Sequence, residues 1–262
     1  MFFSLHNHTY RCNHATGTER EYVENAIKAG YRVIGFSDHA PMPFENDYVS
    51  PFRMDFRQYD DYITVLSDLK REYAGQIEIR IGLEAEYYPK LFPRFLDRIK
   101  GTPIEYLILG QHFTHNELDG VRTADAQTSP ELMTYYVDQL IEGIDTGVFT
   151  YVAHPDVFHL IGHRDFYRNE MLRLCRHAMD ASLPLEINFL GLWDQRHYPC
   201  SEYLEALGMT GCSAIYGCDA HSADKVYQPD TVMAAKQLVD HHQINLLSSI
   251  PLRHPHARKD LS

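Results

Sequence analysis

Histidines and carboxylates that stand close together are the side chains of this sequence best suited to chemistry. The chain has 16 histidines; His6 and His8 form an H-x-H pair, and Asp219 and His221 form a D-x-H pair. On a β-strand, residues two apart point to the same side, so each pair can hold one ion or a bridged pair of ions. Neutral imidazoles and carboxylates are ligands that suit zinc, manganese and iron.

Nine residues of these types stand at equivalent places in the sequence. All but one, which lies in the first expected loop, come at the carboxyl end of an expected strand. They are His6, His8, His14, His39, Glu84, His112, His154, Asp219 and His221. A single histidine at a strand end is most often an ordinary hydrogen-bonded residue, but so many on one face are hard to explain separately. We therefore expect these residues to form a metal site.

The elements that must position these residues alternate between short apolar segments and longer amphipathic ones, which indicates repeated βα units. We expect strands at residues 2–8, 32–39, 77–88, 104–113, 150–156, 183–191 and 213–222. Helices are expected at residues 18–30, 59–75, 91–101, 129–147, 164–182, 201–211 and 232–243. Thr18 and Glu21 have the spacing of a capping box, and Gly30 suits the end of the first helix.

Repeated βα units close into a barrel or build an open doubly wound sheet. No glycine fingerprint follows the first expected strand, which disfavours the dinucleotide-binding version of the open sheet. We therefore expect an α/β barrel of seven or eight strands, and a single domain over residues 1–262, because such barrels often have about this length. In a β/α barrel, the carboxyl ends of the strands carry the active site.

Composition and charge restrict the class of partner. The chain has 24 Lys+Arg against 36 Asp+Glu, a net charge of −12, which argues against a nucleic-acid partner because phosphate backbones require a basic face. A small phosphorylated substrate is still possible, since metal ions supply local positive charge. The five cysteines have no C-x-x-C spacing, and we find neither a signal peptide nor a long apolar segment. We expect a cytoplasmic protein with reduced thiols and no membrane contact.

Seven motifs in order along the chain resemble the polymerase and histidinol phosphatase (PHP) superfamily. They are HNHTYRCNHATGT (6–18), GFSDHAP (35–41), GLEAEYYP (82–89), LGQHF (109–113), VAHPD (152–156), EINFLG (186–191) and GCDAHS (217–222). The length and the HAPMP continuation after His39 resemble the stand-alone histidinol-phosphatase group. The resemblance implies a distorted (β/α)7 TIM-like barrel with a three-metal site.

The resemblance also implies which residues share each ion. One ion would be held by His6, His8, Glu84 and Asp219. A second would share Glu84 as a bridge and add His112 and His154, and a third would take His14, His39 and His221. We expect two or three divalent transition-metal ions, with zinc, manganese and iron all suitable. The chain departs from the family at residues 188–191, where the bulky Phe189 and Leu190 could reshape the pocket beside the ions.

Hydrolysis of a phosphate ester at such a site needs no covalent nucleophile. Clustered cations lower the pKa of bound water to about 7, so that a metal-bridging hydroxide can attack phosphorus directly. Glu84 and Asp219 would then be catalytic through the ions that they hold. An arginine is the natural additional phosphate ligand because its planar fork meets two oxygens. Arg196, after the sixth expected strand, is the first candidate and Arg164, after the fifth, is the second.

Three functions remain open from the sequence. The first is a histidinol-phosphate phosphatase of histidine biosynthesis, which releases L-histidinol and phosphate. The second is a PHP-type phosphoesterase that acts on a nucleotide, a sugar phosphate or phosphotyrosine. The third is a non-catalytic metal-binding module, which the complete set of nine ligand-type residues disfavours.

Overall fold

Eight parallel strands in chain order form the sheet of this protein. The computed structural model describes residues 3–45 and 48–255, so residue 2 of the expected first strand lies outside the described residues. The strands are β1 (Phe3–Ser4), β2 (Val33–Phe36), β3 (Glu78–Ala85), β4 (Tyr106–Leu109), β5 (Phe149–Val152), β6 (Leu185–Asn188), β7 (Ser213–Gly217) and β8 (Asn245–Leu246). Each strand pairs with the next one, which excludes a doubly wound sheet because its strand order reverses at a switch point.

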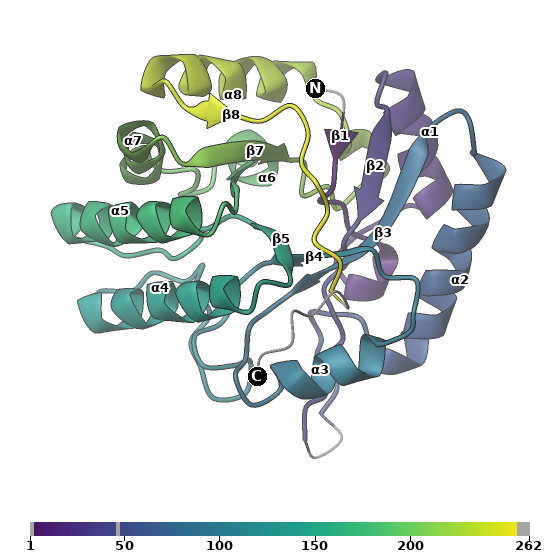
Figure 1. Cartoon of the computed structure of the whole chain (residues 1–262), viewed down its shortest axis with the longest axis horizontal. Coiled ribbons are helices and arrows are strands. Elements are labelled where there is room, and N and C mark those ends of the chain that lie inside the picture. Colours follow the sequence, from purple (N-terminus) through teal and green to yellow (C-terminus); the bar gives the residue numbers. More distant parts are fainter. Residues whose placement is uncertain (1–2, 46–47, 256–262) are drawn as a thin grey trace.

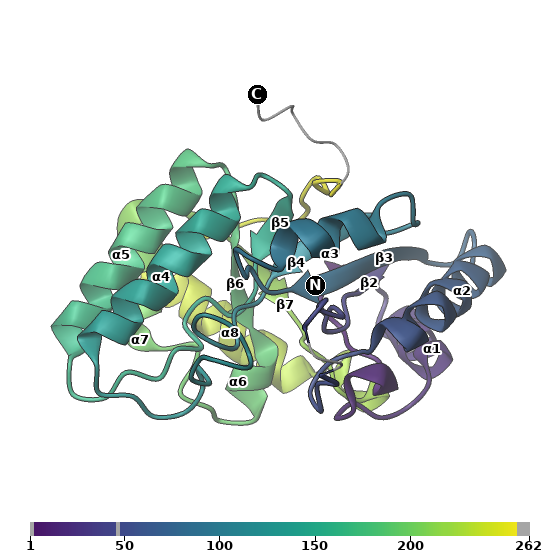
Figure 2. The same cartoon turned by 90° about the horizontal axis from the view of Figure 1, so that it is seen from below.

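The helices lie around the outside of the curled sheet (Figures 1 and 2). They are α1 (Glu19–Lys28), α2 (Phe56–Glu72), α3 (Phe92–Ile99), α4 (Pro130–Asp145), α5 (Arg164–Asp180), α6 (Phe189–Trp193), α7 (Ser201–Thr210) and α8 (Pro229–His242), with 3-10 turns η1 (Tyr10–Cys12) and η2 (Ala223–Lys225). No helix in these described ranges is long and apolar enough to cross a membrane.

Local capping explains where the first two helices begin. The expected capping box of α1 is confirmed, since Thr18 and Glu21 exchange both of its hydrogen bonds. Helix α2 begins at Phe56, earlier than expected, because Asp55 forms a second capping box with Gln58. A side chain that satisfies the free N–H groups of the first turn fixes the start of a helix more firmly than propensity does.

The sixth expected strand is shorter than residues 183–191, and that prediction was wrong beyond Asn188. The Asn188 side chain caps a new helix by accepting a hydrogen bond from Gly191 N at 3.0 Å. This cap turns the chain into α6, because an asparagine at the N-cap position offers the first turn an acceptor that a strand would not use. Phe189 and Leu190 are therefore buried on a short helix beside the end of the barrel.

The first and seventh strands meet where they end. Asn7, just after β1, forms a parallel bridge with Ala220, just after β7. His8 N donates to Ala220 O at 3.0 Å, and Asp219 N donates to His6 O at 2.9 Å. Strand β8 adds a short eighth member beside the start of β7. The predicted distorted (β/α)7 barrel is confirmed, and its seven strands all end at the same face of the barrel.

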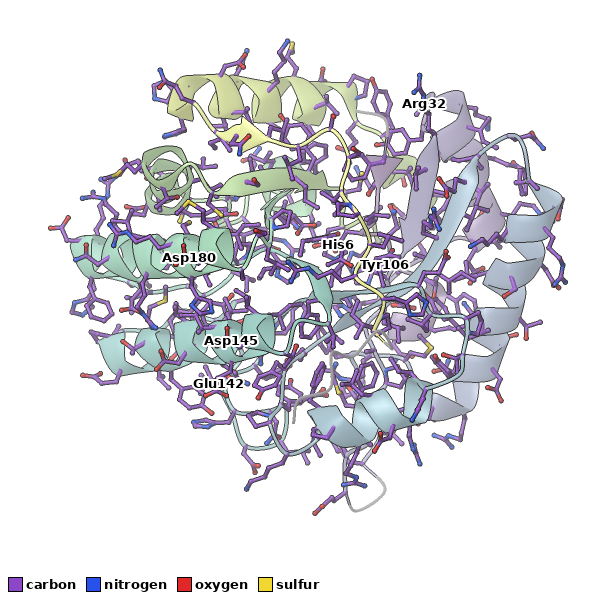
Figure 3. All side chains as sticks on the ribbon, in the orientation of Figure 1. His6, Arg32, Tyr106, Glu142, Asp145 and Asp180 are labelled. Atoms are coloured by element: carbon purple, nitrogen blue, oxygen red, sulfur yellow. The ribbon has the colours of Figure 1, made fainter. Side chains whose placement is uncertain are left out.

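The interior of the barrel is filled from the opposite end. The side chains that fill it are Leu5, Tyr106, Ile108, Tyr151, Ala153 and Ile215. The segment after β8 runs across the strands (yellow in Figure 1), and its Leu247, Ile250 and Leu252 pack against this cluster. Figure 3 shows Tyr106 and His6 close to the centre, whereas Asp145 and Asp180 lie on the outer helices. The interior side chains therefore pack between this end of the barrel and the face at which the strands end.

Tyr106 ties three strands together, and its removal tests this interior. Its hydroxyl donates to Leu5 O at 2.6 Å and to Phe36 O at 3.1 Å. Tyr106→Phe should lower the free energy of unfolding by about 1–2 kcal/mol, because two buried carbonyls lose a donor. Urea denaturation measures the change. Tyr227→Phe, whose ring is 38% exposed, is the control and should change the value by less than about 0.5 kcal/mol; equal effects would contradict the role of Tyr106.

Candidate metal centre

All nine predicted ligand residues gather at the carboxyl ends of the strands. His6 and His8 follow β1, His39 follows β2, and Glu84 lies within β3. The others follow η1, β4, β5 or β7 and are His14, His112, His154, Asp219 and His221. Parallel strands end at one edge of their sheet, so positions up to 215 residues apart in the sequence converge there. The convergence is what the sequence predicted, while metal ligation by these residues stays a prediction.

Glu84 lies at the centre of the cluster. Its Oε1 is 2.7 Å from His154 Nε2, and its Oε2 is 2.8 Å from His39 Nδ1. The other ring nitrogens near this carboxylate lie 3.6–3.7 Å away and belong to His112, His6 and His8. The side chain is buried, and despite these short distances neither of its oxygens has a well-aligned hydrogen-bond donor among the described residues. A buried carboxylate that faces several ring nitrogens in this way fits a bridging metal ligand.

A second group is formed by His6, His8 and Asp219. His6 Nε2 lies 3.2 Å from His8 Nε2, and Asp219 Oδ1 lies 2.9 Å from His8 Nε2. Asp219 adopts a positive φ of 49°, as does His154 at 29°. Such a backbone costs a non-glycine residue about 1–3 kcal/mol unless the surrounding structure holds it in place. The strain is consistent with side chains that are held toward a shared ligand.

The third group is formed by His14, His39 and His221, as the family resemblance implies. Their ligand atoms lie within 4.8 Å of one another, and His221 Nε2 is 3.0 Å from His14 Nε2. Burial lowers the pKa of all three imidazoles. They are therefore neutral near pH 7, which is the state in which an imidazole binds a metal.

The two central carboxylates are charged in spite of their burial. Burial opposes ionisation, but the imidazoles of His112, His6 and His154 hold the pKa of Glu84 well below its usual value. Burial acts likewise on Asp219, and His6 and His8 hold its pKa well below the usual value. Two buried carboxylates among imidazoles form the donor set that suits divalent zinc, manganese or iron. The residues therefore fit a metal cluster.

Three further carboxylates orient the histidines and were not found from the sequence. Glu186 Oε1 lies 2.8 Å from His6 Nδ1, and Glu186 Oε2 accepts from His154 N at 2.8 Å. The other two carboxylates face His8 Nδ1 and His112 Nδ1, each at 3.4 Å, and belong to Asp38 and Glu86. Carboxylates behind metal-binding histidines fix the ring orientation. The signal was present, because Asp38 precedes His39 and Glu86 follows Glu84 by two.

A cavity of about 650 Å³ opens above the cluster. Arg196 lines it together with several of the predicted ligands. Its Nε donates to Asp194 Oδ2 at 2.9 Å and its Nη1 donates to Tyr198 OH at 3.2 Å. Leu190 also lines the cavity, so the departure from the family motif does shape the pocket.

Arg164 does not lie in this cavity. Its side chain is 64% exposed and forms an ion pair with Glu202. It lines a separate cavity of about 350 Å³ with His159 and His197. The structure therefore does not bring the second predicted phosphate ligand to the cluster, because α5 begins at Arg164 and places its first residue outside the barrel mouth.

The cavity contains cationic and aromatic side chains that the sequence analysis did not single out. Lys225 Nζ lies 4.1 Å from the centre of the Trp193 ring, in a cation–π contact. Arg122, Phe52 and Phe113 form other parts of the wall. No spacing in the sequence identifies these residues, because they come from loops that follow different strands.

Comparison with known proteins agrees with this geometry. The model of the PHP domain family matches residues 4–189. The chain belongs to the PHP domain family. Asp219 and His221 lie beyond the matched residues, and the fold nevertheless brings them to the cluster.

Relatives of this PHP chain include proteins named histidinol-phosphatase. The probable histidinol-phosphatase of Deinococcus radiodurans is 32% identical over 233 residues, which are 84% of this chain and 86% of that protein. The histidinol-phosphatase of Bacillus subtilis is 36% identical over 119 residues, 43% of this chain and 44% of that protein. The histidinol phosphate phosphatase of Lactococcus lactis, solved in complex with zinc, L-histidinol and phosphate, matches with a TM-score of 0.73. It is 19% identical, and the match covers 95% of this chain and 96% of that one, which confirms the fold.

Gly110 leaves the space that Glu84 occupies, and its replacement tests the central carboxylate. A Cβ at position 110 would lie 1.9 Å from Glu84 Oε1. Gly110→Ala should therefore displace this carboxylate and lower the metal content by at least one ion per chain, as elemental analysis of the folded protein measures.

Gly82→Ala is the matched control for this variant. A Cβ at position 82 would meet the Tyr106 ring at 2.4 Å, away from Glu84. Overpacking should destabilise both proteins by about 1–3 kcal/mol, but only Gly110→Ala should lose metal. Full metal content in Gly110→Ala would mean that Glu84 is not a ligand.

Proposed function

We propose that this chain is a metal-dependent phosphomonoesterase that hydrolyses L-histidinol phosphate to L-histidinol and phosphate, as a step of histidine biosynthesis. The observation that carries the proposal is the complete set of nine ligand-type side chains beneath a cavity that also contains Arg196. The name of the Deinococcus radiodurans relative, which matches most of both chains, supports the choice of substrate. We further propose that the chain acts as one catalytic domain, since its ligands run from position 6 to position 221.

We infer that the chain holds two or three divalent ions, with zinc, manganese or iron as suitable metals. His6, His8, Glu84 and Asp219 would hold one, and Glu84 would be shared with a second that His112 and His154 complete. The third would lie among His14, His39 and His221. When bound, such ions neutralise phosphoryl oxygens and make water nucleophilic near neutral pH.

Arg196 would orient the phosphoryl group above the cluster. Asp194 and Tyr198 hold two of its nitrogens, and within the described part of the chain its Nη2 meets no acceptor. A guanidinium that its neighbours already orient can donate to a phosphoryl oxygen without losing side-chain freedom at that moment. The contact would stabilise charge that moves onto the phosphoryl oxygens during the reaction.

The aromatic side chains of the cavity would contact the rest of the substrate. Trp193 and Tyr198 come from the same short segment of the chain as Arg196, while Phe52 and Phe113 come from two other loops. Flat apolar faces suit an imidazole ring, and they also exclude water from the reacting group. A small phosphomonoester with one ring therefore fits this cavity better than a polymer does.

Phosphate release from a panel of esters tests the proposed substrate. The metal-loaded protein should cleave histidinol phosphate with a higher kcat/KM than a nucleotide, a sugar phosphate, phosphotyrosine or an aryl phosphate. The activity should be lost after a chelator removes the ions and should return with Mn²⁺ or Zn²⁺. A tenfold preference for another ester would mean that histidinol phosphate is not the substrate. Activity that persists after complete removal of the metal would contradict the metal-dependent mechanism.

Arg196→Ala tests the phosphate contact separately from metal binding. Loss of a charge-assisted contact in a site shielded from water should cost about 2–4 kcal/mol of transition-state stabilisation, or roughly 30- to 1,000-fold in kcat/KM. The metal content should be unchanged, and Arg196→Lys should recover only part of the activity because an ammonium cannot reproduce the planar fork. Steady-state kinetics and elemental analysis measure both quantities.

Arg164→Ala is the control for this prediction. Because Arg164 is exposed and paired with Glu202, its loss should change kcat/KM by less than about threefold. If neither variant altered the kinetics, the ions alone would hold the phosphate and the role of Arg196 would be wrong.

A further inference from the structure

Arg53 is a buried cation that the proposed reaction does not use. It lies in the loop between β2 and α2, and only 2% of the residue is exposed. Its Nη2 is 2.6 Å from Glu86 Oε1, and its Nε is 2.7 Å from Glu117 Oε2. A buried ion pair stabilises a fold little compared with apolar packing of the same volume, because both charges lose their water. Stability alone therefore does not explain this arrangement.

One of the two carboxylates that Arg53 holds also faces a predicted metal ligand. Glu86 Oε1 lies 3.4 Å from His112 Nδ1, and Glu86 Oε2 accepts a hydrogen bond from His112 N at 3.3 Å. A carboxylate behind a metal-binding histidine fixes the orientation of the ring. His112 Nε2 does point toward the cluster, 3.6 Å from Glu84 Oε1.

The backbone around Arg53 contacts the other side of the cluster. Arg53 O accepts from Asn13 Nδ2 at 3.3 Å, next to His14 in the sequence, and Met54 N donates to His39 O at 3.3 Å. The Phe52 ring contacts three of the imidazoles: it is stacked on His14, tilted against His39 and edge-on to His112, with ring centres 5.5, 4.5 and 5.1 Å apart. One loop thus lies against ligands of both the second and the third proposed ion.

We infer that Arg53 is a positioning residue, which fixes His112 through Glu86 and so sets the affinity of the ion that His112 and Glu84 share. Without the guanidinium, Glu86 loses the partner that holds its Oε1 in place, so the carboxylate can turn away from His112. That movement removes the support of the His112 ring. The inference rests on the proposed metal site, but it does not depend on which ester the enzyme cleaves.

Metal titration of the chelator-stripped whole chain tests the role of Arg53. Co²⁺ is the probe, because its visible absorption reports each occupied site, and competition with Zn²⁺ gives the affinities. Arg53→Met should bind one ion about 10- to 100-fold more weakly, as expected when an outer partner of a metal-binding histidine is lost. The remaining ions should keep wild-type affinity. Arg53→Lys should recover part of the loss, since an ammonium can balance Glu86 but cannot reach both carboxylates.

Arg57→Met is the matched control, since the Arg57 side chain is 78% exposed and pairs with Asp55; its titration should equal that of the wild type. Circular dichroism identifies the variants that fold. If Arg53→Met does not fold, the titration of Arg53→Lys tests the inference instead. If neither variant folds, the same titration is made with Glu117→Gln, which removes one charged partner of Arg53 and leaves the arginine in place. Wild-type affinity for every ion in the deciding variant overturns the inference, and so does an equal loss at all ions. The titration uses no substrate, so a different substrate preference leaves its result unchanged.

Discussion

The burial of Glu84 is the constraint on which the rest of this structure depends. A carboxylate that is removed from water costs several kcal/mol unless positive charge balances it. Five imidazoles lie within 3.7 Å of its oxygens, where they could hold a cation beside it, and they come from the ends of β1, β2, β4 and β5. Only a parallel barrel brings so many strand ends to one point, so the charge of one residue and the fold are linked.

The residues around Glu84 leave little space for larger side chains. Gly110 has no side chain because any Cβ would occupy the position of Glu84 Oε1, and Gly217 stands in the same relation to Glu186. His154 and Asp219 adopt a positive φ. The surrounding structure can hold this backbone conformation, because hydrogen bonds join His8 to Ala220 and Asp219 to His6 at the same level of the barrel.

The sequence predicted what depends on local pattern and on the general rule for strand ends. The alternation of apolar segments indicated the barrel, and the nine ligand-type residues stood where strands had to end. It did not predict what depends on side-chain direction: Arg164 lies outside the mouth, and Asn188 ends its strand by capping α6. Glu86, Glu186 and Asp38 were missed although two of them adjoin predicted ligands, because the sequence does not show which ring nitrogen a carboxylate faces.

Charge is arranged in layers around the cluster, and this order reconciles an acidic protein with an anionic substrate. The chain has a net charge of −12, and its innermost layer contains the carboxylates of Glu84 and Asp219, which divalent ions can neutralise. Outside them lie the cavity cations Arg196, Arg122 and Lys225. An approaching phosphoryl group therefore meets positive charge at the cavity wall and again at the metal ions. The surplus of carboxylates over basic residues instead favours substrates whose other end is cationic, as an amine or an imidazole is.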